Sequence, residues 1–369
     1  MIPVFDPLIG DDDLQAVIAA FKRGEISGSF GTAVPEFEAT FSKYCGAKHG
    51  VAVSSGTTAL QLAVAAAGIG PGDEVLISAC TNIATALAVI HNGAIPVPVD
   101  SEDVTWNLNL DLVEGLITPK TRAIIPVYVY GHPVDMDRLG QIAAKHRLVV
   151  IEDCAESHGA TVRGRMTGSF GAMGCFSFYA NKVVTTGEGG MVITSDDKLA
   201  ERLRLLRNLA FQQPRFFHEV AGYNFRMTGM QAAMGTTQTN KIEMVIEKKR
   251  TVAATYNRLL ADVGWLQTPA ELEWARNVYW MYGVVVRPDA KVKRDAVIGR
   301  LRADGVDTRT FFCSMAEQPC VTRVAGYRPV KTPVADRLWT DGFYLPSSPL
   351  LTEQEIVRVC DALKRAGRA

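Results

Sequence analysis

The chain has 369 residues, and its 39 basic and 39 acidic side chains give a formal net charge of +0. Hydrophobic residues make up 47% and charged residues 21% of the sequence, which is typical of a globular protein and excludes a chain that is disordered throughout. A neutral chain gives no reason to expect a nucleic-acid partner, and the short basic run at residues 248–250 indicates a solvated helix face. The length indicates about two domains.

The seven cysteines are odd in number and include no CxxC pair, which argues against a disulfide scaffold or a zinc module. Reduced thiols are typical of the cytoplasm, where we expect the protein to reside. The N-terminus lacks a basic leader, and no apolar stretch reaches the roughly 18 residues of a membrane span, so no membrane partner is expected. Neither an HExxH motif nor an EF-hand loop occurs, so we expect no metal site.

Between residues 49 and 195, short β-rich runs alternate with helical patterns. Continuous apolar runs that are each followed by a helix indicate a parallel sheet covered on both faces, a doubly wound α/β domain. We expect strands at 50–54, 74–78, 95–99, 123–128, 148–152, 175–179 and 191–194, and helices at 57–67, 83–91, 110–117 and 136–146.

The pattern changes after residue 195. Two long helices are expected at 198–208 and 229–250, and the alternative for the second is a continuation through Leu260 with a break. A strand at 280–286, a helix at 295–303 and a terminal helix from residue 352 are expected to follow. We therefore predict a large domain over residues 1–247 and a small α+β domain over residues 248–369. No Gly/Ser linker separates them, so the two domains are expected to pack together.

The sequence SSGTTAL at residues 54–60 predicts a strand that turns through Gly56 into a helix. The first N–H groups of a helix have no partner within it and attract anions, so Gly56 and Thr57 are candidates to hold a phosphate. The alternative is simple helix capping by Ser55 or Thr57. No GxxxxGK[ST] or GxGxxG motif offers a rival phosphate site.

Two further residues suggest chemistry. Asp153 ends a predicted parallel strand, where acidic side chains point into the ligand crevice, although an acid there could also cap the following turn. Lys182 follows 29 residues later, between the aromatic run FSFY and the glycine-rich TTGEGG. A lysine in a sheltered site loses its proton readily and can form a Schiff base with an aldehyde. An anion cradle, an acid and such a lysine are the contacts that pyridoxal phosphate (PLP) requires.

The chain resembles the DegT/DnrJ/StrS sugar aminotransferases, which have the PLP-dependent aspartate-aminotransferase-like fold (type I). The resemblance runs from GEISGSFG at residues 24–31 to YLPSSPLLT at residues 344–352. It rests on SSGTTAL, EDCAESHGA, SFYANKVVTTGEGG and GYNFRM, the last at residues 222–227. It implies a PLP-dependent transfer of an amino group from L-glutamate to a nucleotide-linked keto sugar, with C4 of GDP-4-keto-6-deoxymannose as the expected acceptor.

The resemblance also implies roles for individual residues. Lys182 would bind the coenzyme aldehyde and move protons, and Asp153 would pair with the ring nitrogen. Glu156 would lie beside the coenzyme ring. The phosphate would be held by Gly56, Thr57 and Ser177, and by Asn224 of a neighbouring subunit, so the active unit is expected to be a homodimer. Asn82 stands where the family usually has an aromatic residue that stacks on the ring.

Other functions remain open. A 3-dehydratase of the same fold would carry histidine in place of Lys182, so the lysine argues against it. Aminotransferases for 3-keto sugar nucleotides, keto-inositols or long keto acids are not separated by these motifs. A PLP-binding regulator without turnover would keep the fold, but the intact set of Asp153, Ser177 and Lys182 and the lack of a DNA-binding extension disfavour it.

Overall fold

A computed structural model describes residues 1–367. Its central element is a seven-stranded sheet with the order β1-β9-β8-β5-β4-β2-β3, in which β9 runs antiparallel to both neighbours and the other strands are mutually parallel. The strands are β1 (His49–Val53), β2 (Glu74–Ser78), β3 (Ile95–Val99), β4 (Thr121–Ile125), β5 (Val149–Asp153), β8 (Met173–Ser177) and β9 (Gly190–Thr194).

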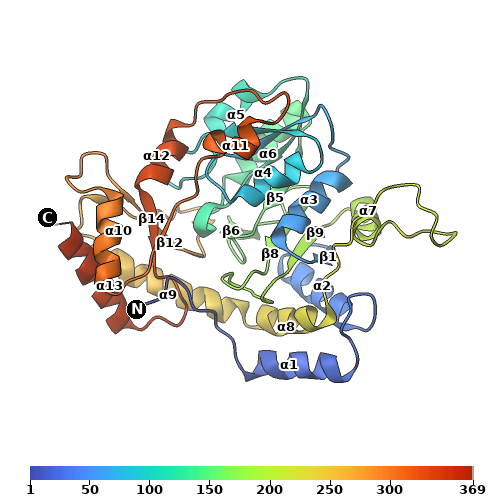
Figure 1. Ribbon diagram of the computed structural model, residues 1–369, viewed down its shortest axis with the longest axis horizontal. Coiled ribbons are helices and arrows are strands. Elements are labelled where there is room, and N and C mark those ends of the chain that lie inside the picture. The colour runs from blue at the N-terminus through green and yellow to red at the C-terminus, as the bar shows by residue number, and fades with distance from the viewer. Residues whose placement is uncertain (368–369) are drawn as a thin grey trace.

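Helices cover both faces of this sheet (Figure 1). Successive side chains of a strand point to opposite faces, and in β2 Leu76 joins one apolar core while Val75 and Ile77 join another. The core around Leu76 includes α2 (Ala33–Tyr44), α5 (Leu110–Leu116) and α6 (Met136–His146). The core around Val75 includes α3 (Gly56–Ala66), α4 (Ile83–Ile90) and α7 (Asp197–Arg207). The predicted doubly wound α/β architecture is therefore confirmed.

A second, antiparallel sheet has the order β10-β12-β14-β13 and its own apolar core. Its strands are β10 (Leu266–Gln267), β12 (Tyr282–Val286), β13 (Arg309–Thr310) and β14 (Gly342–Leu345); α9 (Ile242–Leu260), α10 (Arg294–Ala303) and α13 (Glu353–Ala366) contribute to the same core. The remaining elements are α1 (Asp11–Lys22), α8 (Gly229–Asn240), α11 (Pro319–Thr322), α12 (Pro333–Asp341), the 3₁₀ turns Val129–Gly131 and Met315–Glu317, and the short strands β6 (Thr161–Val162), β7 (Arg165–Met166) and β11 (Ala275–Arg276).

Helix α9 spans the domain boundary expected at 247/248. Its first turns, through Ile246, pack with the core of the large sheet, whereas its residues from Val252 onward pack with the core of the small sheet. In Figure 1, α9 runs below the small sheet and meets α8, which lies below the large sheet. The two parts of the chain thus share one rigid helix.

The prediction of a single helix over 229–250 is wrong, because α8 ends at Asn240 and α9 begins at Ile242. Lys241 leaves the helical conformation between them, and its Nζ forms ion pairs with Asp12 at 2.9 Å and with the buried Asp13 at 2.6 Å. Helix α1, which carries both aspartates, lies along α8 (Figure 1). The break therefore coincides with a long-range ion pair that the local pattern does not contain.

The prediction that residues 248–250 form a solvated face is wrong at Lys249, which is only 2% exposed. Consecutive helical residues point about 100° apart, so a run of three on a packed helix directs one of them inward. The Lys249 Nζ donates a hydrogen bond to the carbonyl oxygen of Ser347 at 2.7 Å. Among residues 1–367, no helix is both long and apolar enough to span a membrane.

Candidate active site

A cavity of about 290 Å³ lies where β5 and β8 end and α3 begins. Of the residues singled out from the sequence, seven line it: Gly56, Thr57, Asn82, Asp153, Glu156, Ser177 and Lys182. Parallel strands place their carboxyl ends at one edge of a sheet, and helix N-termini face the same edge. Segments that are more than a hundred residues apart in the sequence therefore meet in one site.

The N-terminus of α3 forms one wall of the cavity. Ser55 caps the helix, since its Oγ accepts a hydrogen bond from Thr58 N at 3.1 Å, so the capping alternative holds for Ser55. The backbone N–H groups of Gly56 and Thr57, at the end of the helix that lines the cavity, have no acceptor within the helix. A Cβ at position 56 would lie 2.6 Å from the Cβ of Ser177, so only glycine fits this approach. Helix N–H groups beside a serine hydroxyl are suited to a phosphate.

Asp153 lies at the end of β5 and is only 3% exposed. Its Oδ2 accepts a hydrogen bond from Thr85 Oγ1 at 2.8 Å, and its Oδ1 accepts one from Ala155 N at 3.1 Å. Burial raises the pKa of this carboxyl, and the bond from Thr85 partly opposes the rise. A carboxylate that is fixed on both oxygens and faces a cavity can pair with a cationic ring nitrogen there.

Lys182 follows β8 and reaches the same cavity. Removal from bulk water lowers the pKa of its amine, and the carboxyl groups of Glu156 and Asp153 oppose this shift. Burial raises the pKa of Glu156, which accepts a hydrogen bond from Tyr130 N at 2.8 Å. The amine thus lies close to two carboxyl groups in a sheltered site, where it can act as a nucleophile or as a base.

The two asparagines singled out from the sequence behave differently. Asn82 lines the cavity, but its Oδ1 caps α4 by accepting a hydrogen bond from Ala84 N at 3.0 Å. Asn224 does not line the cavity; it is exposed and forms an isolated β-bridge with Asn208. Asn224 therefore does not contribute to the cavity of its own chain, and its expected role concerns the site of a neighbouring subunit.

The residues of the site that were not assigned a role from the sequence include Thr85, Trp280, Phe312 and Tyr344. Thr85 holds Asp153, and its hydroxyl lies 2.9 Å from that of Thr81, which precedes α4. The three aromatic residues line the cavity from the second part of the chain. Trp280 lies within VYWMY at residues 278–282, and nothing in that local sequence shows that its ring meets Lys182.

The residues present fit PLP. The α3 N-terminus suits the phosphate, Asp153 suits the ring nitrogen, and the Lys182 amine suits the aldehyde. The Oδ1 atom of Asn181, next to Lys182 in the cavity lining, is buried without a hydrogen-bond partner, so the wall has an unused acceptor. Across residues 1–367, no group of three or more His, Cys, Asp and Glu side chains could hold a metal ion.

This fold and this site define the aspartate-aminotransferase-like (type I) class of enzyme. The chain matches the DegT/DnrJ/EryC1/StrS aminotransferase family over residues 7–364, and it belongs to that family. The family that the sequence motifs indicated is thereby confirmed.

Individual relatives cover almost the whole chain. GDP-perosamine synthase of Caulobacter vibrioides is 41% identical over 98% of this chain and 97% of its own length. GDP-perosamine synthase of Escherichia coli O157:H7 is 34% identical, again over 98% of this chain and 97% of its own length. The PLP form of a Streptococcus pneumoniae protein matches the fold with a TM-score of 0.93, at 25% identity, over 99% of this chain and 98% of that one.

Proposed function

We propose that the protein uses PLP to transfer an amino group from L-glutamate to C4 of GDP-4-keto-6-deoxymannose, which gives GDP-perosamine and 2-oxoglutarate. The observation that carries the proposal is the convergence of Lys182, Asp153 and the α3 N-terminus on one cavity. When bound, PLP supplies a ring that accepts the electron pair left behind when a proton departs from the carbon bearing the amino group.

The residues of the chain would divide this work. Gly56, Thr57 and Ser177 would hold the phosphate of the coenzyme. Asp153, held by Thr85, keeps a proton on the ring nitrogen, which makes the ring a stronger electron acceptor. The amine of Lys182 would hold the coenzyme by its aldehyde and, when free, would take a proton from the donor carbon and return one to the product.

The proposed acceptor rests on the relatives that carry the name GDP-perosamine synthase and cover nearly the full chain. Such a product would serve surface polysaccharides such as the lipopolysaccharide O-antigen. We place the reaction in the cytoplasm, because all seven cysteines are free thiols, which persist in a reducing compartment.

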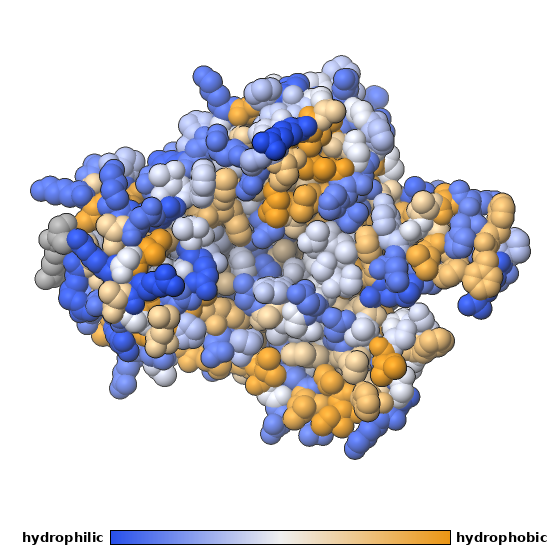
Figure 2. All heavy atoms as spheres, in the orientation of Figure 1, coloured by the Kyte–Doolittle hydropathy of each residue, from blue (hydrophilic) through white to orange (hydrophobic). Residues whose placement is uncertain are grey.

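We further propose a homodimer in which Asn224 reaches the phosphate site of the partner. Two observations support it. Asn224 lies outside the cavity of its own chain, and the neighbouring loop carries the exposed aromatic residues Phe216 (74%) and Phe217 (61%). Figure 2 shows that apolar side chains gather on this projecting loop and over α1, where Leu14 and Phe21 are exposed. Exposed apolar patches such as these mark protein contacts.

The test is spectroscopic. The purified protein is loaded with the amine form of the coenzyme, and keto sugar nucleotides are screened for return of visible absorbance. We expect GDP-4-keto-6-deoxymannose to restore it faster than 3-keto sugar nucleotides, keto-inositols or long keto acids do. A faster response to one of those compounds would reassign the substrate, and no response to any of them, with coenzyme firmly bound, would favour a regulator without turnover.

A further inference from the structure

Trp280 is the aromatic residue that meets the reactive amine. The Lys182 Nζ lies 3.5 Å from the centroid of the Trp280 ring, which is the geometry of a cation–π contact. Trp280 is only 4% exposed, so this contact is shielded from water. Its Nε1 donates a hydrogen bond to the carbonyl oxygen of Asn181 at 2.8 Å, and Asn181 directly precedes Lys182. One side chain thus contacts both the amine and the backbone beside it.

The segment that carries Trp280 is held in an unusual conformation. Tyr279 has φ = 48°, in the left-handed region that bulky side chains seldom adopt. The Tyr279 N donates a hydrogen bond to Asn277 Oδ1 at 2.8 Å, and Val278 N donates one to Gly131 O at 3.3 Å. A conformation of this kind persists only where surrounding contacts enforce it.

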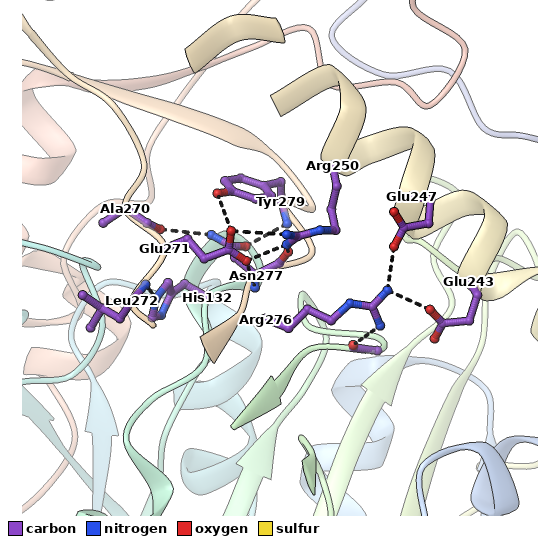
Figure 3. A network of polar contacts seen from close by, with 11 residues as sticks. His132, Glu243, Glu247, Arg250, Ala270, Glu271, Leu272, Arg276, Asn277 and Tyr279 are labelled. Atoms are coloured by element: carbon purple, nitrogen blue, oxygen red, sulfur yellow. Dashed lines mark hydrogen bonds and ion pairs between the residues drawn. The ribbon is translucent and has the colours of Figure 1, made fainter. Parts of the chain in front are cut away.

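A polar network supplies that enforcement (Figure 3). The Nη1 of Arg250 donates to Glu271 Oε1 and to the carbonyl oxygen of Asn277, each at 2.5 Å. The backbone N of Asn277 donates to the same Glu271 oxygen at 2.8 Å, and the Tyr279 hydroxyl donates to the other at 3.4 Å. In Figure 3 the side chains of Arg250, Glu271 and Tyr279 converge around Asn277. Arg250 is therefore committed to this network.

We propose that Trp280 is a positioning residue for Lys182: its ring face holds the amine at the cavity wall, and the Arg250–Glu271–Asn277 network fixes the segment that carries the ring. The proposal rests on the proposed function, since it assigns a purpose to the placement of that amine. It links the second part of the chain to the reactive group of the first. A Lys182 amine without this contact would be free to turn toward Glu156 or Asp153.

The experiment measures how the Lys182 amine titrates in coenzyme-free protein. Trace acetic anhydride reacts with neutral amines, and peptide mass spectrometry follows Lys182 from pH 6 to 11. The groups that face this amine are the carboxyls of Glu156 and Asp153, and Lys182 in turn affects the neutral His158; Glu188 and Tyr179 line the same cavity. All are unchanged in variants at position 280.

A ring face stabilises the protonated amine, so Trp280→Leu is expected to lower the titration midpoint of Lys182 by about half a unit to one unit. Trp280→Phe keeps an aromatic face, so its Lys182 midpoint is expected to stay close to that of the wild type. Lys248, which is exposed on α9, serves as an internal reference in the same spectra and should not move. An unchanged or raised midpoint in Trp280→Leu, or an equal shift at Lys248, overturns the proposal.

Glu271→Gln provides a second variant outside the cavity, should Trp280→Leu fail to fold. Weakening the network is expected to lower the Lys182 midpoint in the same direction by a smaller amount, and an unchanged midpoint would remove the network from the proposal. The visible absorbance of coenzyme-loaded Trp280→Phe and wild type is then titrated with pH as a second readout. Because the first measurement uses no coenzyme, a protein that never binds PLP could still show the Trp280 effect, which separates failure of the inference from failure of the proposed function.

Discussion

Two lysines of this chain have lost much of their contact with water, and they differ in what surrounds them. Burial lowers the pKa of Lys249 to about 7, and among the described residues no acidic side chain contacts its amine, which lies 5.3 Å from the centroid of the Phe5 ring. Burial also lowers the pKa of Lys182, but Glu156 and Asp153 oppose that shift. Lys249 is embedded in packing between α9 and the segment at Ser347, whereas Lys182 faces a cavity.

The difference shows that a perturbed amine is a poor guide to function when it stands alone. Both lysines would pass a search for unusual pKa values. Only Lys182 has space for a ligand, carboxyl groups to balance its charge and an anion cradle within the same cavity.

The largest expected effect is that of Lys182→Ala. Without the amine, no covalent link to the coenzyme can form and no group of the chain takes the substrate proton, so transamination should fall by at least about 1,000-fold. Borohydride reduction followed by mass spectrometry should find coenzyme on wild type and none on the variant. Lys249→Met is the matched control: it should keep the adduct and nearly full activity. Normal turnover by a folded Lys182→Ala protein would exclude the proposed role of Lys182.

Asp153→Asn should come next. The amide keeps the hydrogen-bonding geometry toward Thr85 but cannot hold a proton on the ring nitrogen, so the half-reaction with glutamate should slow by about 100-fold or more while coenzyme still binds. Stopped-flow absorbance with glutamate alone measures that step. Thr85→Val removes only the partner hydroxyl and should produce a smaller loss. If Asp153→Asn reacts at the wild-type rate, the carboxyl does not face the ring nitrogen.

How far the sequence predicted this site depended on the range of the interactions. Gly56, Asp153 and Lys182 each carry a local signal, a turn, a strand end or a sheltered run, and parallel-sheet topology then brings them together. Thr85 contacts Asp153, which is 68 positions away, and Trp280 contacts Lys182, which is 98 positions away. No local sequence pattern indicates either contact. For the same reason the break at Lys241 could not be predicted, since its partners lie on α1.

Lys249→Met tests the other lysine through stability. In the unfolded chain this amine titrates near its ordinary value of 10.5, and in the folded chain near 7, so the unfolded state binds more protons between these values. Stability contributed by this group therefore rises with pH through that window, by up to about 1.4 kcal/mol per pH unit. Lys249→Met lacks this pH-dependent contribution. The free energy of unfolding in urea of the variant, relative to that of the wild type, should therefore fall by about 2 kcal/mol between pH 7.5 and 9. If the difference in free energy of unfolding between the variant and the wild type does not change with pH, Lys249 is charged or solvated in the folded protein.

The smallest expected effect, Glu156→Gln, is the sharpest probe of how Lys182 differs from Lys249. The Glu156 carboxylate favours the protonated form of Lys182 and so raises its pKa. Removing that charge should lower the pKa, and because the neutral amine is the active form, the acid limb of the pH–rate profile should move to lower pH by about one unit. Glu156→Asp keeps the charge and should leave the limb in place. A limb that stays fixed in Glu156→Gln, or moves to higher pH, would mean that burial alone governs Lys182, as it does Lys249.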